Sequence, residues 1–342
     1  TSRFCYNFFR LGNSLKGFST VERLTVAEVL CTQDSPLIYM FKPELIPSLS
    51  LGITAKIEIL SRDYGFDLKE VFPLIDHISE ALSENEFLIS HFIQPDLFIR
   101  IRRGKEDFVK NILHNNEIDF CSLSATTIAI PNGTNLQKLL SLEGLYEVQD
   151  LSSQQTIEFI TAKPNENWWD ACAASGGKAL MFLDKYPTAH LLVSDIRLSI
   201  LRNLEERFEK AGITSTYRKK ILDLSLPVDH LLQGEEFDGI ILDVPCSGSG
   251  TWGRTPEMIQ QIDLAKLNTF TTLQKDISSN AIPYLKKGGS LIYITCSIYR
   301  DENEDVVAYL LANFDLDLQK KSVLKGYENK ADSMFAAHFI KR

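Results

Sequence analysis

The sequence predicts an α/β protein whose largest part is a doubly wound, mainly parallel sheet of the Rossmann-like class. From about residue 155 onward, strand-like apolar runs alternate with amphipathic helical segments, as in a parallel sheet covered on both faces. A loop of small residues opens a helix after the first of these strands, and polar residues follow the later ones. Because ligands bind at the carboxyl ends of such strands, this arrangement also predicts a binding site.

The start of the chain, residues 1–80, is expected to form a helical region. Apolar residues there recur at helical spacing, for example at Ile57, Leu60, Val71 and Ile75. The first twenty residues include basic side chains and no long apolar run, so we expect neither a signal peptide nor a membrane anchor.

Residues 81–150 are expected to form a second, small α/β unit. The segments 96–103 and 119–130 are typical of strands, and 106–115 is typical of a helix between them. The turn residues Pro-Asn-Gly at 131–133 end the second strand.

Residues 151–342 are expected to form the doubly wound domain. Strands are predicted at 167–173, 190–196, 214–221, 237–246 and 290–298. Helices are predicted at 198–212, with Gly212 as its left-handed end, and at 269–289. The tail should add a helix at 301–314, a strand at 315–323 and a closing segment at 334–342. With the usual strand order 3-2-1-4-5, the fourth and fifth strands are neighbours.

The amino-acid composition disfavours several classes of protein. Among 342 residues, 45 are acidic and 36 basic, giving a net charge of -9, which disfavours coating of nucleic acid by bulk charge but allows a local basic patch. The six cysteines include no C-x-x-C pair, so we expect no zinc module, no disulfide framework and no bound metal. Reduced thiols and the lack of about 18 consecutive apolar residues favour a cytoplasmic protein without a membrane partner.

The residues after the predicted strands form a candidate ligand site. The loop DACAASGGK at 170–178 lets backbone amides approach a polar ligand group, although it is not the G-x-G-x-x-G dinucleotide fingerprint. Asp195 stands where a carboxylate can take both hydroxyls of a ribose, and Asp223 and Asp243 follow the next two strands. A tight turn with helix-capping aspartates is the structural alternative.

Two cysteines follow the fourth and fifth strands. Neighbouring strands lie about 4.8 Å apart, so Cys246 and Cys296 should face one cleft. A single cysteine is more often an inert core residue than a nucleophile, but two at adjacent strand ends, each flanked by polar residues or glycine, favour chemistry.

Four blocks resemble the RsmB-like RNA 5-methylcytosine methyltransferases, which use S-adenosylmethionine. They are DACAASGGK, SDIR, LDVPCSGSGTWGRTPE and YITCSIYRDENE, and VQDLSSQ at 148–154 is similar to that family's lead-in to the catalytic domain. The resemblance covers roughly 85–342. Two departures are present: Ser175 and Ala179 replace the usual proline and threonine, and Gly253 precedes a single Arg254 where many relatives have two arginines.

The resemblance implies a methyltransferase domain in which a thiolate adds to the target base, because carbon 5 of cytosine is a poor nucleophile without such help. It implies that Cys296 attacks carbon 6, Cys246 assists release, Asp243 hydrogen-bonds the ring nitrogen, and Lys178 contacts the cofactor or the base. The implied contacts to S-adenosylmethionine are Cys172, Ala173, Ala174, Ser175, Gly176, Gly177, Lys178, Asp195, Asp223 and Asp243.

The resemblance implies RNA as the partner, with ribosomal RNA preferred to transfer RNA. We expect the protein to be a monomer, and the resemblance implies that the small α/β unit helps to hold the RNA. The basic candidates for RNA contact are Arg100, Arg102, Arg103 and Arg254. Short basic runs are more often solvated faces, which is the alternative for each. Three other functions stay open: a ribosome-assembly factor that does not need catalysis, a transfer RNA methyltransferase, and a nicotinamide-dependent dehydrogenase, which the missing glycine fingerprint disfavours.

Overall fold

The computed structural model describes residues 2–213 and 217–342, and these residues contain a seven-stranded sheet in the order β10-β11-β9-β8-β5-β6-β7. Five strands run parallel in the expected order: β5 (Asn167–Asp170), β6 (His190–Asp195), β7 (Tyr217–Ile221), β8 (Phe237–Asp243) and β9 (Leu285–Thr295). The tail adds two antiparallel strands, β10 (Leu316–Leu324) and β11 (Met334–Lys341). The predicted strand order is therefore confirmed.

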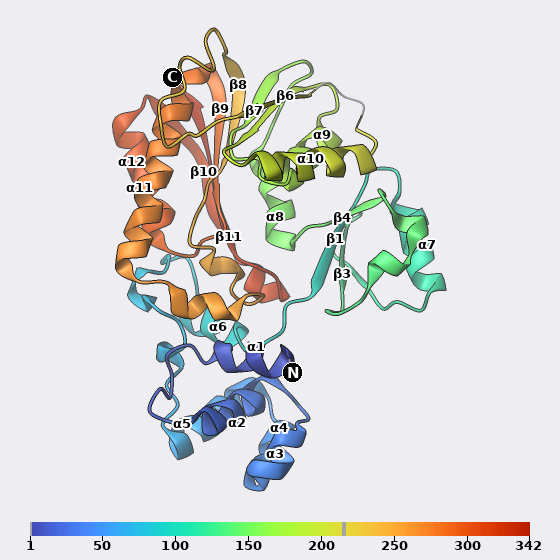
Figure 1. The fold of residues 1–342 in the computed structure, drawn as a ribbon, viewed down its shortest axis with the longest axis vertical. Helices are drawn as coiled ribbons and strands as arrows, with labels where there is room; N and C mark the ends of the chain where they lie inside the picture. The colour runs from blue at the N-terminus through green and yellow to red at the C-terminus, as the bar shows by residue number, and fades with distance from the viewer. Residues whose placement is uncertain (1, 214–216) are drawn as a thin grey trace.

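Helices cover both faces of this sheet (Figure 1), as the doubly wound class requires. On one face lie α9 (Gly177–Lys185) and α10 (Leu198–Lys210), and on the other lie α11 (Leu264–Ala281) and α12 (Glu304–Asn313). The central strand β8 is buried on both sides, since Ile240, Ile241 and Leu242 have no exposed surface. Among the described residues, no helix combines the length and apolarity needed to cross a bilayer.

Several element boundaries differ from the sequence prediction, and β9 begins at Leu285, within the segment predicted as a helix. The helix predicted at 269–289 begins earlier, at Leu264, where the Asp263 side chain caps it, and ends at Ala281 because Pro283 cannot donate a helical hydrogen bond. In the tail, a 3-10 turn, Arg300–Glu302, precedes α12. Residues 214–216 of the predicted third strand lie outside the described residues.

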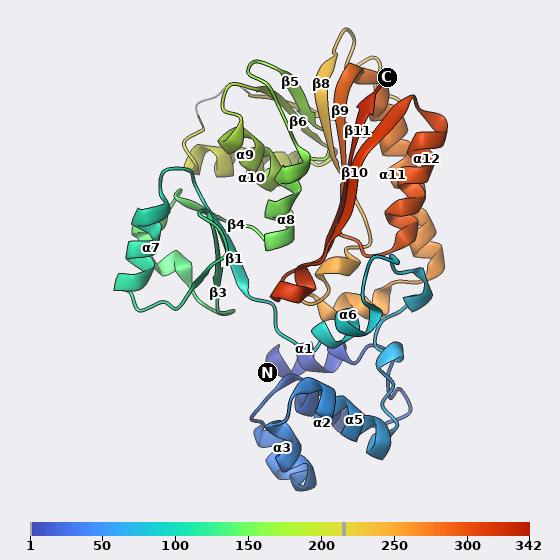
Figure 2. The same ribbon diagram turned by 180° about the vertical axis from the view of Figure 1, so that it is seen from behind.

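A separate antiparallel sheet, of four strands within the described residues, stands beside α8 (Leu151–Gln155) (Figure 2). Its order is β2 (Cys121–Ser122), β3 (Thr127–Ile130), β1 (Leu97–Ile101) and β4 (Tyr146–Val148), and α7 (Glu106–Asn115) packs on it. The segment predicted as one strand at 119–130 is a hairpin, because the chain turns back between β2 and β3.

The N-terminal region is helical, as predicted. Its helices are α1 (Ser2–Arg10), α2 (Thr20–Cys31), α3 (Pro36–Phe41), α4 (Ile46–Leu49), α5 (Ile53–Tyr64) and α6 (Glu84–Ser90). Phe72 and Phe87 belong to the same apolar cluster as Trp252 and Tyr299 of the large domain. Because this packing runs across residue 80, the division into 1–80, 81–150 and 151–342 stays a prediction.

Candidate active site

A cavity of about 460 Å³ opens at the carboxyl ends of the parallel strands. Seven residues of interest line it: Cys172, Ala174, Asp195, Asp223, Asp243, Cys246 and Cys296. The structure therefore brings together both cysteines and three aspartates that the sequence selected. It adds apolar residues that the sequence did not select, among them Leu273 and Ile277 of α11. No local pattern indicates which face of that long helix meets the strands.

The loop between β5 and α9 has an unusual backbone. Ala174 has φ +47° and Gly176 has φ +83°, so two residues of this tight turn lie in the left-handed region. The Ala174 amide donates to the Asp195 carboxylate at 3.1 Å, which joins the ends of β5 and β6. For the non-glycine Ala174 this conformation is strained, and such strain is common where a backbone is held for a ligand.

The remaining loop residues stand behind the cavity wall. A Cβ on Gly176 would lie 2.6 Å from Cγ of Leu204, so the loop packs tightly on α10. Arg207 of that helix donates to the Ser175 hydroxyl and carbonyl oxygens. Ala173 is buried, and neither it nor Ser175, Gly176 or Gly177 lines the cavity; their expected cofactor contacts stay predictions.

Asp170 is an acidic residue at the end of β5 that the sequence reasoning did not select, although it opens the DACAASGGK block. It is 1% exposed, and neither carboxyl oxygen has a well-formed hydrogen-bond partner among the described residues. Burial, followed by the nearby charge of Asp243, raises the pKa of Asp170 to about 8. Asp170 is therefore mostly protonated at neutral pH, and the acidic side chains that line the cavity itself are Asp195, Asp223 and Asp243.

Lys178, in the first turn of α9, provides the cation of the site. Its Nζ donates to Oδ2 of Asp243 at 2.7 Å. Burial alone would lower the pKa of Lys178, but Asp243 outweighs it and the pKa is raised, with a further contribution from Cys296. The ammonium group is therefore charged at neutral pH and interacts electrostatically with Cys296.

The two thiols are in contact, with 3.2 Å between the Cys246 and Cys296 sulfur atoms. They meet because β8 and β9 pair in parallel and because Gly250 N–H donates to the Cys296 carbonyl at 2.9 Å. The hydrogen bond with Cys296, burial, and the nearby charges of Cys296 and Glu302 raise the pKa of Cys246 well above its ordinary value. Cys246 therefore retains its proton at neutral pH.

Of the acidic side chains that follow Cys296, at residues 301–304, only one turns toward the thiol-bearing segments. Asp301 pairs with His77 at 3.0 Å, and Glu304 accepts from the Ser79 hydroxyl. Glu302 alone turns inward, toward Ser247. This separation explains how an acidic helix start is compatible with thiolate formation at Cys296.

Two arginines predicted to contact RNA are engaged inside the protein. Arg100 donates to Asp184 at 2.6 Å and Arg102 donates to its other carboxylate oxygen at 2.8 Å, so both tie β1 to α9. Both side chains are at most 15% exposed, which leaves little surface for a phosphate. Arg103, by contrast, is exposed and borders a second cavity of about 760 Å³ beside the small sheet.

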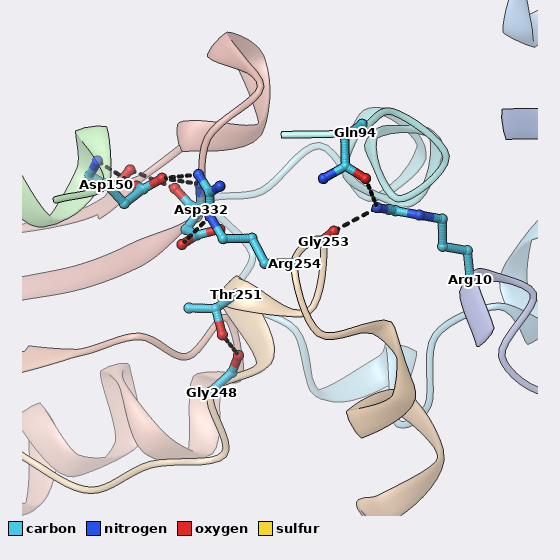
Figure 3. Close-up of polar contacts among 9 residues, drawn as sticks. Arg10, Gln94, Asp150, Gly248, Thr251, Gly253, Arg254 and Asp332 are labelled. Carbon is cyan, nitrogen blue, oxygen red and sulfur yellow. Dashed lines mark hydrogen bonds and ion pairs between the residues drawn. The ribbon is translucent and has the colours of Figure 1, made fainter. Parts of the chain in front are cut away.

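Arg254 is also held by carboxylates (Figure 3), so its predicted RNA contact would compete with an internal pair. Its Nε donates to Asp332 at 3.0 Å and its terminal nitrogen to Asp150 at 2.8 Å. Arg10 of α1 donates to the adjacent Gly253 carbonyl at 2.7 Å. The segment that follows Cys246 is therefore fixed from both the VQDLSSQ block and the N-terminal region.

Residues 157–339, more than half of the chain, match the family described as 16S rRNA methyltransferase RsmB/F. The chain belongs to the RsmB/F family. The ribosomal RNA small subunit methyltransferase B of Shewanella oneidensis is 33% identical to this RsmB/F chain over 246 residues, 70% of the chain and 56% of the relative. The chain spans about half the length of the curated relatives it matches.

Solved structures share the fold of the RsmB/F chain. The structure of PH0851 has a TM-score of 0.77 at 20% identity and covers 99% of this chain and 89% of its own. NSun6 from Pyrococcus horikoshii with SFG has a TM-score of 0.66 at 15% identity and covers 75% of this chain and 94% of its own. Both the α/β class and the N-terminal arrangement therefore occur in known proteins.

Proposed function

We propose that this chain is an RNA cytosine-5 methyltransferase that transfers a methyl group from S-adenosylmethionine to a cytosine of small-subunit ribosomal RNA. The observation that carries the proposal is the thiol pair Cys246 and Cys296, 3.2 Å apart on the wall of a cavity rich in aspartates. The RsmB/F family and the names of its curated members support ribosomal RNA as the substrate.

The residues of the cavity fit the proposed cofactor. S-adenosylmethionine supplies, when bound, an electrophilic methyl group on a positively charged sulfur. Asp195 would hold its ribose hydroxyls, and the 172–174 loop, Asp223 and Asp243 would hold the rest. Asp170 is buried beneath this loop without a hydrogen-bond partner among the described residues, so it keeps the capacity to bond a polar group of the ligand. The NSun6 structure contains SFG on the same fold, which is consistent with this position for the cofactor.

In the proposed reaction, the Cys296 thiolate adds to carbon 6 of the cytosine. The charged Lys178 would stabilise the thiolate as it forms, and Asp243, held by Lys178 at 2.7 Å, would orient the ring through its nitrogen. The addition moves an electron pair toward carbon 5, which would take the methyl group as the methyl–sulfur bond breaks and leaves its electron pair on the cofactor's sulfur. Cys246 keeps its proton during this step, so it does not compete as a nucleophile.

Release then needs a base for the proton on carbon 5. Cys246 is in contact with Cys296 and therefore with the adduct that forms there. Once Cys296 is bonded to carbon 6, its hydrogen bond and charge no longer raise the pKa of Cys246; the Cys246 proton then passes to solvent, and its sulfur accepts the proton of carbon 5. The electron pair of that bond restores the ring double bond, and the carbon–sulfur bond breaks to regenerate the Cys296 thiolate.

Trapping the adduct tests this function. A Cys246→Ser variant incubated with 16S ribosomal RNA and S-adenosylmethionine should accumulate a covalent protein–RNA complex, seen as a shifted band on a denaturing gel. Adding Cys296→Ala should abolish the band, whereas adding Cys121→Ser, an exposed cysteine of the small sheet, should leave it unchanged.

A parallel reaction with transfer RNA shows which class of RNA is the substrate. Adducts with transfer RNA alone would reassign the substrate. RNA binding without an adduct, and without methylated cytosine from the unmodified protein, would favour the assembly-factor alternative and refute the proposed reaction.

A further inference from the structure

A buried polar cluster lies directly behind the two thiols. We call it the serine–glutamate network, and its members are Ser247, Ser249, Gln274, Ser297 and Glu302. Every member is buried, and four of the five have no exposed surface. Two of its serines, Ser247 and Ser297, are the chain neighbours of Cys246 and Cys296. The network therefore touches both thiol-bearing segments without lining the cavity.

Glu302 is the acceptor at the centre of this network. Its Oε1 accepts the Ser247 amide at 2.8 Å and the Gln274 side-chain amide at 2.9 Å. Its other oxygen accepts the Ser247 hydroxyl. Three donors thus converge on one carboxylate, a group that only accepts when ionised. These donors offset burial only in part, so the pKa of Glu302 remains raised by its burial.

The serine hydroxyls extend the network across the gap between the two strand ends. Ser249 and Ser297 lie 3.0 Å apart between oxygens, and Ser247 lies 3.1 Å from Ser249 and 3.2 Å from Ser297. The Ile298 amide donates to the Ser249 hydroxyl at 3.0 Å. The segment after β8 is therefore bound to the segment after β9 by side chains as well as by the strand ladder.

We propose that Glu302 is a positioning residue that holds Cys246 and Cys296 within reach of the same base, acting through Ser247 and Ser297. This inference deepens the methyltransferase function proposed above and rests on it for its catalytic consequence. Without the carboxylate, the Ser247 amide and hydroxyl lose their acceptor, and the 246–250 segment is no longer bound to the turn at 300–302.

The charge of Glu302 has a second consequence. It is one of the groups that raise the pKa of Cys246, so it helps to keep the proton on that sulfur while Cys296 attacks. Glu302 therefore contributes to both the distance between the two sulfurs and the assignment of the proton between them.

Two substitutions separate these effects. Glu302→Ala removes the acceptor altogether. Glu302→Gln keeps the shape, because its carbonyl oxygen can accept the two amides and its NH2 can donate to the Ser247 hydroxyl, but it removes the charge. Glu304→Gln is the matched control, since that neighbouring acid contacts Ser79 and not the network.

The distance between the thiols is measured without any RNA, by crosslinking with dibromobimane, which becomes fluorescent when it joins two nearby thiols. Peptide mass spectrometry identifies the Cys246–Cys296 product, and Cys246→Ser is the blank. We expect Glu302→Ala to slow this crosslink at least about tenfold, by analogy with the cost of small misplacements in active sites. Glu304→Gln should crosslink at the original rate.

The charge effect is measured by alkylation of Cys246 with iodoacetamide in a Cys296→Ala background. Because a negative charge nearby disfavours thiolate, Glu302→Gln should move the alkylation profile to lower pH, whereas a purely structural role would leave it in place. In methyl transfer, the same variant should lower kcat and leave the KM for RNA unchanged.

These experiments distinguish a failure of the inference about Glu302 from a failure of the proposed methyltransferase function. If the original chain methylates no RNA but crosslinking depends on Glu302, the positioning of the thiols stands and the methyltransferase proposal fails. If methylation occurs and the Glu302 variants crosslink, alkylate and turn over like Glu304→Gln, the inference is refuted. Should Glu302→Ala not fold, judged by thermal unfolding, the alkylation profile and kcat of Glu302→Gln decide.

Discussion

The buried carboxyl group of Asp170 should make the stability of the protein depend on pH in a way that Asp170→Asn removes. Burial, followed by Asp243, raises its pKa to about 8 in the folded state, against an ordinary value near 4 in the unfolded chain. The folded state therefore binds the proton more tightly. The stabilisation from this proton is complete below pH 4 and is lost as the pH rises toward 8.

The magnitude follows from this shift. Between the two pKa values, each pH unit lowers the free energy of unfolding by about 1.4 kcal/mol. Raising the pH from 6 to 8 should therefore lower the free energy of unfolding of the original protein by roughly 2 to 3 kcal/mol through Asp170 alone. Asparagine has a similar shape and does not titrate. The other groups titrate in both proteins, so the difference between their two pH dependences of stability gives the contribution of Asp170.

Urea unfolding of both proteins at pH 6 and pH 8 measures the effect. We expect the free energy of unfolding of Asp170→Asn to fall less than that of the original protein over this range, by the stated amount. Parallel losses in the two proteins would show that Asp170 is ionised across the range and that its surroundings are more polar than the structure indicates.

Three further predictions follow from the site. Lys178→Met should lower the rate of methyl transfer by about a hundredfold and shift its optimum to higher pH, because the Cys296 thiolate loses its cation; an unchanged pH profile would contradict the role of Lys178. Arg10→Met should lower the stability to urea by roughly 2 to 4 kcal/mol, since the buried guanidinium donates to three acceptors; an unchanged urea midpoint would count against this. Gly176→Ala should lower the thermal midpoint more than Gly212→Ala, which has a similar positive φ but open space around it; equal shifts would exclude the steric explanation.

The sequence predicted the parts of the fold that depend on local pattern. Apolar runs separated by amphipathic helices defined the parallel strands, and the strand order followed from the architecture that this rhythm permits. Cys246 and Cys296 converged as predicted because parallel neighbours end at the same edge of a sheet. The helix boundary at Ala281 was missed, although Pro283 carries the signal for it.

The sequence could not predict which partner a charged side chain takes when the partner is distant in the chain. Arg100 is bound to Asp184, 84 positions away, and neither segment shows a local sign of this pairing. Glu302 looks like one member of an exposed acidic helix start, and only the approach of Ser247 makes it a buried acceptor. Burial of a charge depends on tertiary packing, which local periodicity does not describe.

The contacts between residues 77–79 and the turn after Cys296 also affect how the protein can be made. His77 and Asp301 are 224 positions apart, so at roughly 5–20 residues per second the first waits on the order of 10 to 45 seconds before the second is synthesised. Phe72, which packs against Tyr299 in the finished protein, lacks that partner throughout the interval. The apolar surface around Phe72 is thus synthesised early and covered late, although the core formed within residues 11–92 can pack before that contact is made.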